Sequence, residues 1–395
     1  MRTSIDSDPD HPGAALRAWL IDQALPTWAT TGVDRQAGGF FEAIDLQGHA
    51  VEAPRRTRVV ARQVYVFATA ARHGWLAGAD ALVEHGLAFM LQKLRRENGS
   101  FASSVRPDGT LVDARFDLYE QAFALFALAA ARRERPDRAA LHDEAVALVQ
   151  TLRARWRHPH IGFEEAAPRK LPLRSNPHMH LLEAALEWAE VAEPRDRPLW
   201  NDLADELAQL CLAHFIDPKS GALREHFDGD WQPMPGAPGR VVEPGHQFEW
   251  GWLLMRWAAR SGDAVALAAA RRLTAIGEAH GIDRARGVAV NTLDETLRVT
   301  DAAAKLWPQT ERIKAWHATL VRAADTPARA DARAHLRDAV AGLTRYLLPS
   351  PPGLWHEVMD AHGGFVLQDC RASSLYHIVC AIDTLHSLNL GSNPR

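Results

Sequence analysis

The amino-acid sequence predicts an all-α fold, an (α/α)6 barrel in which six helical hairpins close into a ring. Two observations lead to this prediction. Most of the 395 residues follow the helical hydrophobic period, and six short glycine-led segments interrupt the helices at nearly equal intervals. We expect one domain over residues 1–395, because no linker or low-complexity tract divides the chain.

Seven segments carry the clearest helical pattern. In each of them apolar residues recur at positions i, i+3, i+4 and i+7, and many are alanine or leucine, which favour helix formation. The segments are 15–25, 58–75, 118–134, 141–156, 180–192, 248–260 and 373–388.

Short segments of a different kind lie between the helices. Most begin with glycine, continue with an apolar or aromatic residue, and then have an acidic or polar one. When one glycine is taken from each segment, the intervals are 60, 63, 59, 66 and 66 residues. Such intervals hold two helices of about 15 residues with their connections. The glycines are Gly39, Gly99, Gly162, Gly221, Gly287 and Gly353.

Four of these segments reach a second turn signal and therefore predict short β-hairpins. In a closed ring we expect the inner helices to surround a central cavity and the hairpin loops to gather at one end of it. An open helical solenoid is the alternative fold, because the repeat alone does not establish closure.

Composition argues against several classes of protein. A net charge of −4 leaves no basic excess for nucleic acid, and no apolar run approaches the ~20 residues of a membrane span. The N-terminus has no apolar signal-peptide core, and the three cysteines lack CxxC spacing. We therefore expect a cytoplasmic protein without nucleic-acid or membrane partners, and without disulfides or structural zinc.

The 13 tryptophans and 19 histidines have two interpretations. One is a large core filled with tryptophan and a surface that carries histidine. The other is a pocket that stacks flat apolar faces and moves protons near neutral pH.

Four clusters are more polar than the helices they join. In the first, Arg58 and Arg62 are four residues apart and share one helix face. They form either a solvated charged edge or guanidinium groups that hold oxygen atoms in the cavity.

The second cluster follows the helix-start signal at Asn176. His178, His180 and Glu183 fall in the first helical turns. They are either a capping arrangement whose histidines bond their neighbours, or part of a site. His180 and a later histidine could share a metal ion, although no HExxH or comparable spacing occurs.

The third cluster is VEPGHQFEWGWLL, residues 241–253. His246 and Glu249 are three residues apart and share a helix face, with Trp250 and Trp252 beside them. A carboxylate next to an imidazole orients it and raises its pKa, as a general base near neutral pH requires. A buried structural His–Glu pair is the alternative.

The fourth cluster is CRASSLYHIVCAI, which contains His377 among apolar residues. His377 is either a core histidine or faces His246 across the cavity. Two pairs of tryptophan and glutamate at loop positions are typical of a sugar-binding wall, where the ring stacks on the sugar and the acid binds hydroxyls. These pairs are Trp307 with Glu311 and Trp355 with Glu357.

These motifs together resemble the N-acylglucosamine 2-epimerase superfamily, and most of all its mannose isomerase branch. They are SNPHMHLLEAALEW, VEPGHQFEWGWLL, LWPQTE, LWHEVMD and SSLYHI, and the resemblance runs from about Arg58 to His377. It implies an (α/α)6 barrel that acts on reducing sugars without a metal. No cofactor is expected, because the ATP effector of one branch has no matching phosphate loop here.

The resemblance also implies roles for individual residues. His246 and His377 would be the acid/base pair, His180 the third active-site histidine, Arg58 the active-site arginine and Glu249 the carboxylate that orients His246. The substrate would contact Asn176, Glu183, Trp307, Glu311, Trp355 and Glu357.

The expected reaction interconverts D-mannose and D-fructose through a cis-enediolate. One histidine takes the C2 proton, the other moves protons at O1 and O5, and Arg58 and His180 hold O1 and O2. The same residues also fit a 2-epimerase of mannose or glucose, N-acylglucosamine or a disaccharide. The expected partner is a small sugar, and the expected state is a monomer or homodimer.

Two other functions are alternatives. A helical-repeat protein could bind a peptide on a concave face, but the polar residues recur at corresponding positions of different repeats. A glycoside hydrolase needs a pair of carboxylates. Its candidates are Glu243, Glu249, Glu311 and Glu357.

Overall fold

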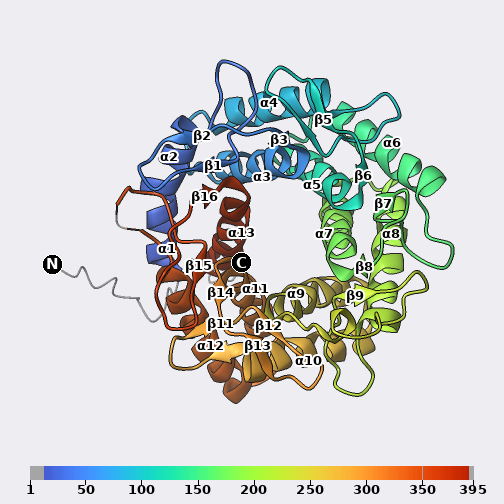
Figure 1. Ribbon diagram of the computed structural model, residues 1–395, viewed down its shortest axis with the longest axis vertical. Helices are drawn as coiled ribbons and strands as arrows, with labels where there is room; N and C mark the ends of the chain where they lie inside the picture. The colour runs from blue at the N-terminus through green and yellow to red at the C-terminus, as the bar shows by residue number, and fades with distance from the viewer. Residues whose placement is uncertain (1–12, 349, 391–395) are drawn as a thin grey trace.

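The chain forms a ring of helices around a central axis (Figure 1) in a computed structural model that describes residues 13–348 and 350–390. Six helices line the inside of the ring, and each contacts the next, including the last with the first. Closure confirms the (α/α)6 barrel and excludes the open solenoid. The inner helices are α3 (Thr57–His73), α5 (Leu118–Glu134), α7 (Ser175–Val191), α9 (Pro244–Ser261), α11 (Trp307–Val321) and α13 (Ala372–Leu390).

The outer helices pack against the outside of this ring. Three of the outer helices continue into a wider π-helical turn (η1, η2 or η3), which the hydrophobic period did not predict. The outer helices are α1 (Ala14–Trp19) with η1 (Leu20–Ala24) and α2 (Leu25–Thr30), α4 (Ala79–Phe89) with η2 (Met90–Leu94), α6 (Ala139–Arg155), α8 (Arg197–Leu210) with η3 (Cys211–Phe215), α10 (Ala264–Gly281) and α12 (Thr326–Thr344).

Inner and outer helices differ in composition because they differ in burial. α5 is buried on nearly all sides between its neighbours, and its sequence is apolar almost all round. α12 buries one stripe, and its other positions are polar or charged. None of the described helices has the length and apolar character that crossing a membrane requires.

Two inner helices begin earlier than the period predicted. α7 begins at Ser175 and α9 at Pro244, four or five residues before the predicted starts. Proline at the first helical position of α9 has a fixed φ that suits a helix start. As a result His180 and His246 lie inside the first turns of two inner helices.

Short strands occupy the connections that lead from each outer helix to the next inner helix, at one end of the ring. They are β1 (Ala43–Ile44), β2 (Ala50–Val51), β3 (Arg55–Arg56), β4 (Ser104–Val105), β5 (Leu111–Asp113), β6 (Phe116–Asp117), β7 (Ala166–Ala167), β8 (Leu173–Arg174), β9 (His226–Phe227), β10 (Ile282–Asp283), β11 (Val288–Ala289), β12 (Thr292–Leu293), β13 (Val299–Asp301), β14 (Ala304–Lys305), β15 (Val358–Met359) and β16 (Cys370–Arg371). A 3-10 turn, η4 (Pro238–Arg240), precedes α9.

These strands join neighbouring repeats in a regular way. The strand before an inner helix pairs antiparallel with a strand of the following repeat, as β3 does with β4, β6 with β7, β8 with β9 and β14 with β15. Before α9 the same joint is a single bridge between Val242 and Leu293. The pair β16–β1 closes the ring by joining the last repeat to the first.

One polar side chain in most repeats fixes the start of the inner helix. In each glycine segment one residue forms a β-bridge to a residue just after the preceding outer helix, and the polar side chain comes two residues later. It accepts the backbone N–H just before the inner helix of its own repeat. A carboxylate or amide here satisfies a donor that the helix itself cannot. The acceptors are Glu42, Glu165, Glu225, Asn291 and Glu357, and the donors are Arg56, Arg174, Glu243, Lys305 and Arg371.

The marker glycines of the repeat share a backbone conformation. All six have φ between 71° and 84°, the left-handed region that glycine adopts without strain. Gly353 also lies against the first repeat, because a Cβ atom there would come within 2.5 Å of the Gln23 carbonyl oxygen. The same atom on Gly287 would meet nothing within 4 Å.

We predict that Gly353→Ala destabilises the ring more than Gly287→Ala does. Both substitutions incur a backbone penalty of about 1–2 kcal/mol in the left-handed region. Gly353→Ala adds an overlap with the η1 backbone, which costs about 1–3 kcal/mol more. Urea unfolding of both variants measures the difference, and equal losses would mean that the first and last repeats are not tightly packed at this point.

Candidate active site

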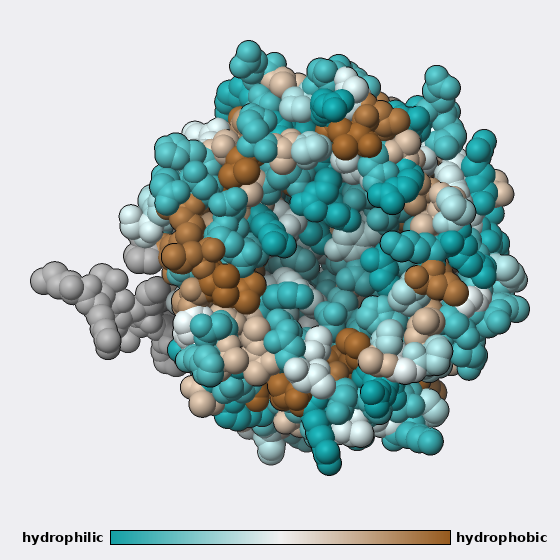
Figure 2. Space-filling model, viewed as in Figure 1, coloured by the Kyte–Doolittle hydropathy of each residue, from teal (hydrophilic) through white to brown (hydrophobic). Residues whose placement is uncertain are grey.

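A cavity of about 400 Å³ opens at the hairpin end of the ring, among the first turns of the inner helices. An adjoining hollow of about 370 Å³ shares part of its wall. Figure 2 shows one face of the ring, with a central hollow surrounded mainly by hydrophilic residues. The cavity is lined by Arg62, Tyr119, Asn176, His180, Glu243, His246, Glu249, Lys305, Trp307, Glu357, Val358, Gln368, Arg371, Ser373, Ser374 and His377.

His246 is held by a carboxylate from another segment. Its Nδ1 lies 2.7 Å from Glu225 Oε2 and 3.7 Å from Glu243 Oε2. Burial lowers the pKa of His246, but the negative charges of Glu225 and Glu243 outweigh it and raise that pKa to about 10. His246 is therefore an imidazolium at neutral pH.

The amide of Asn176 faces the other nitrogen of His246, with Nδ2 3.0 Å from Nε2. Oδ1 of Asn176 is buried without a hydrogen-bond partner. Turning this amide by half a rotation lets Oδ1 accept the proton that the imidazolium carries on Nε2. Asn176 thereby orients the ring of His246.

His377 differs from His246 in being neutral. Its Nδ1 lies 2.8 Å from Glu311 Oε1, which leaves Nε2 as the nitrogen free for a substrate. Burial, followed by the positive charges of Arg62 and Lys314, lowers the pKa of His377 well below its usual value. The Trp307 ring lies close to both histidines, 5.0 Å from the His246 ring and 5.9 Å from the His377 ring.

His180 lines the same cavity and is also neutral. Its Nδ1 lies 3.1 Å from Glu183 Oε2, which also accepts the Tyr376 hydroxyl. Burial lowers the pKa of His180 to about 4, although Glu183 acts against it. The cavity therefore presents one imidazolium and two neutral imidazoles near pH 7, so one pocket holds both a proton donor and a proton acceptor.

The structure places Arg62, four residues after the predicted Arg58, deeper in the cavity. Nη1 of Arg58 is paired with Glu120 Oε1 at 3.0 Å, and Arg58 lines only the adjoining hollow. Arg62 is 5% exposed and lines both spaces. Its guanidinium donates to the Tyr119 hydroxyl at 2.8 Å.

Two of the predicted substrate contacts lie beneath the cavity wall. Glu183 and Glu311 are fully buried and hold His180 and His377, but neither lines the cavity. Glu249 reaches the cavity floor, yet it does not bond His246. The prediction that Glu249 orients His246 is wrong, because Glu225, in the connection just before β9, bonds Nδ1 of that ring.

The prediction that Trp355 stacks on a sugar is also wrong. Trp355 is fully buried and stacks on Trp28 with ring centres 5.2 Å apart, with Trp19 at its edge. Its Nε1 donates to Glu357 Oε1. Trp355 therefore belongs to the core that joins the first and last repeats, whereas Trp307 and Glu357 do line the cavity.

His178 has a structural role that its neighbour His180 does not share. Nε2 of His178 lies within 3.2 Å of the backbone N and O of Phe163. In other repeats a glutamine grips the equivalent backbone with its amide, as Gln121 does at Phe101. Only the second histidine of the HxH pair thus reaches the cavity.

Sequence reasoning missed Glu225 as the partner of His246. A signal was present, because Glu225 occupies the acidic position of a repeat segment, in GALRE from Gly221. Lys314 was also missed, since it lies inside α11 and nothing in its spacing marks it.

Three groups of histidine and glutamate place their ligand atoms close enough to hold a metal ion. In two of them Lys314 already supplies a positive charge near Glu249 or Glu311. The groups are His180 with Glu183 and Glu249, Glu225 with Glu243 and His246, and Glu249 with Glu311 and His377.

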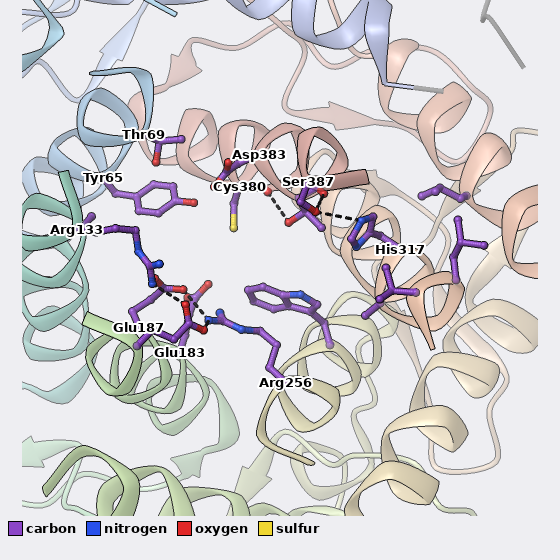
Figure 3. Close-up of a pocket in the computed structure, with 18 of the residues that line it drawn as sticks. Tyr65, Thr69, Arg133, Glu183, Glu187, Arg256, His317, Cys380, Asp383 and Ser387 are labelled. Atoms are coloured by element: carbon purple, nitrogen blue, oxygen red, sulfur yellow. Dashed lines mark hydrogen bonds and ion pairs between the residues drawn. The ribbon is translucent and has the colours of Figure 1, made fainter. Parts of the chain in front are cut away.

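A second cavity, of about 1030 Å³, lies toward the other ends of the inner helices (Figure 3). Arg133 and Arg256 approach the carboxylate of Glu187 from two sides, each at 2.7–2.8 Å. None of the three site histidines lines it. The larger cavity is thus less suited to proton transfer than the smaller one.

The fold and the cavity together define a class, an (α/α)6 barrel with three histidines and several acidic side chains around one cavity. The chain belongs to the N-acylglucosamine 2-epimerase (GlcNAc 2-epimerase) family, which it matches over residues 39–381. The family match confirms the resemblance found in the sequence motifs.

Individual relatives extend this result. The chain is 47% identical to the mannose-6-phosphate isomerase of Rhizobium meliloti (strain 1021), over 93% of this chain and 95% of that protein. It is 29% identical to the D-mannose isomerase of Thermobifida fusca, over 89% and 93% of the two chains. The structure of cellobiose 2-epimerase from Spirochaeta thermophila DSM 6192 has the same fold, with a TM-score of 0.85, 24% identity and coverage of 99% and 100%.

We predict that Glu225→Gln lowers the pKa of His246 from its raised value. Removing one of the two carboxylates that hold the proton leaves burial less opposed, and a shift of about 1–3 units is expected. NMR titration of the imidazole signals measures it without any substrate. Glu357→Gln, at the equivalent position of the last repeat, is the matched control. An unchanged His246 midpoint in Glu225→Gln would contradict the pairing.

Proposed function

We propose that this enzyme interconverts D-mannose and D-fructose. Family membership and 47% identity to a mannose-6-phosphate isomerase make the chain a sugar isomerase. The observation that carries the proposal is that two histidines beside Trp307, each bonded to a different carboxylate, differ in charge: His246 is protonated and His377 is neutral. A neutral His377 can accept a proton from carbon, while a protonated His246 can donate one to oxygen.

The proposed reaction begins with ring opening. His246 gives its proton to O5 as the C1–O5 bond breaks, and it recovers a proton from the O1 hydroxyl. The product is the open-chain aldose, and His246 regains its original charge. Trp307 lies beside His246 and offers a flat apolar face on which the sugar can stack.

Proton transfer from C2 to C1 follows. His377 takes the C2 proton through Nε2, the C2–H electrons form the C1–C2 double bond, and O1 gains a proton from His246. The O2 hydroxyl then returns a proton to His246, and His377 delivers its proton to C1 to give the ketose. Arg62 and His180 are placed to bind O1 and O2, and positioned donors stabilise the developing enediolate.

The carboxylates beneath the histidines fix which nitrogen reacts. Glu311 and Glu225 each bind Nδ1, so Nε2 is the reactive nitrogen in both rings. A carboxylate also stabilises the imidazolium that forms when the ring takes a proton. Glu249 is buried, and its pKa is raised well above the usual value by burial and by Glu311, so it can donate a hydrogen bond to a sugar hydroxyl.

A sugar phosphate is the second candidate substrate. Lys305 and Arg371 line the cavity, and within residues 13–348 and 350–390 neither side chain has an ion-pair partner. Two free cations at a cavity wall suit a phosphate group. The relative from Rhizobium meliloti carries the name of a mannose-6-phosphate isomerase.

A 2-epimerase is the alternative reaction at the same site. It requires protonation of C2 from both faces, and His246 and His377 flank the same tryptophan. The cytoplasmic location and the monomeric or dimeric state are proposals from the sequence.

We predict that D-mannose incubated with the enzyme in D₂O gives D-fructose, with deuterium at C1 to the extent that His377 exchanges its proton with solvent. His377→Asn should reduce kcat by about 10²–10⁴-fold, because it removes the base. NMR of the products gives both results. Glucose without fructose would support the 2-epimerase instead, and a fully active His377→Asn variant would overturn the role of His377.

We predict that, if mannose 6-phosphate is the better substrate, its turnover depends on the two free cations, Lys305 and Arg371. Lys305→Gln and Arg371→Gln should each lower kcat/KM for the phosphate by about 10–100-fold, the value of a charged hydrogen bond. Their effect on free mannose should be small. Equal losses on both sugars would mean that these residues do not bind a phosphate.

A further inference from the structure

A buried ionic cluster lies beneath the floor of the active-site cavity. Its centre is Lys314 on α11, whose side chain is fully buried. The ammonium lies 2.5 Å from Glu311 Oε2, 4.0 Å from Glu249 Oε1 and 4.0 Å from the centre of the Trp252 ring. Lys314 lines none of the three cavities described above.

Both cavities stop at this cluster. Trp252, Glu183 and Cys380 line the larger cavity, whereas Glu249 and His377 line the smaller one. Figure 3 shows Glu183 and Cys380 on the wall of the larger cavity. The ammonium of Lys314 is thus sealed from solvent on both sides, where its charge is little screened.

Three buried acidic side chains surround this charge. Glu183, Glu249 and Glu311 come from three different inner helices, and each is 1% exposed or less. A carboxylate without a partner in such a place costs several kcal/mol. The other polar groups that face the cluster are Arg62 and Tyr65 on α3, His180 on α7, and Tyr376, His377 and Cys380 on α13.

Glu311 links Lys314 to the proposed base. One of its oxygens, Oε2, faces the ammonium, and the other, Oε1, faces Nδ1 of His377 at 2.8 Å. The ammonium and the imidazole therefore compete for the negative charge of one carboxylate. The stronger the pairing with Lys314, the less Glu311 favours a proton on His377.

We propose that Lys314 is a positioning residue that acts as a built-in cation, holding Glu311 against His377 and keeping His377 neutral so that it can accept a proton. This inference rests on the proposed function only for its effect on turnover.

The charge states of the cluster agree with this role. Burial lowers the pKa of Lys314, but the carboxylates of Glu311 and Glu249 help raise it above its usual value, so the ammonium persists. Burial raises the pKa of Glu183, but His180 and Lys314 reverse this effect and lower the pKa to about 2. Lys314 thereby affects the carboxylate partners of two site histidines.

The test is Lys314→Met, which keeps the length of the side chain and removes its charge. NMR titration should place the His377 midpoint about 1–3 units higher than in the unsubstituted enzyme. The acid limb of the kcat profile should move up by the same amount, with KM unchanged. Lys314→Arg should restore the original midpoint.

Arg312→Met is the matched control. Arg312 is on the same helix, is 1% exposed, and forms a buried ion pair with Glu278, facing away from the cavity. Both variants lose a buried ion pair, so thermal unfolding should show similar losses of Tm. Only Lys314→Met should move the His377 titration. Equal shifts in the two variants, or no shift in either, would overturn the proposal.

A double variant covers the case in which Lys314→Met does not fold. Lys314→Met with Glu249→Gln removes the ammonium together with the acid group beside it, and leaves Glu311 beside His377. Its His377 midpoint should still rise, and an unchanged midpoint would overturn the proposal. Because titration needs no substrate, it also separates failure of this inference from failure of the mannose isomerase assignment.

Discussion

The joint between neighbouring repeats is the interaction on which the rest of the structure depends. At most joints the acidic residue of the glycine segment uses its backbone carbonyl to accept an N–H at the start of the preceding inner helix. Glu225 accepts from Ser175 in this way, and Glu357 accepts from Leu306. The side chain at that position holds the N–H before its own inner helix. Both bonds satisfy donors that a helix leaves unpaired at its start. They fix where the inner helices begin, and so they bring their first turns together around one cavity.

The active site modifies this frame in a few repeats. Glu225 does what its counterparts do and also binds His246, so one carboxylate serves the fold and the chemistry. His178 grips a strand backbone as glutamines do elsewhere, while His180, two residues on, points into the cavity. Positions that the ring dictates therefore also carry side chains that line the cavity. These side chains are therefore held by the packed starts of the inner helices, and a rigid support favours a precise geometry of the site.

Three histidines that each bond a carboxylate differ in charge because of their other neighbours. His246 has a second carboxylate nearby, Glu243, which helps to keep its proton. His377 and His180 lose theirs through burial, to which the positive charges of Arg62 and Lys314 add. An acid and a base can then coexist in one pocket at one pH. The same logic is seen in enzymes that separate the pKa values of two similar groups by their environments.

The sequence by itself determined the six helical hairpins, whereas only the tertiary structure showed that they close into a ring. The helical period, the glycine segments and their spacing reflect constraints on backbone and burial that act within each repeat. The motifs also identified His180, His246 and His377, all of which line the cavity. Only the tertiary structure decided that Glu225 holds His246, that Glu311 holds His377, that Arg62 reaches deeper than Arg58, and that Trp355 belongs to the core. A helical period fixes which residues share a face, but the rotation of each helix and the register of each strand against its neighbours arise from packing between repeats.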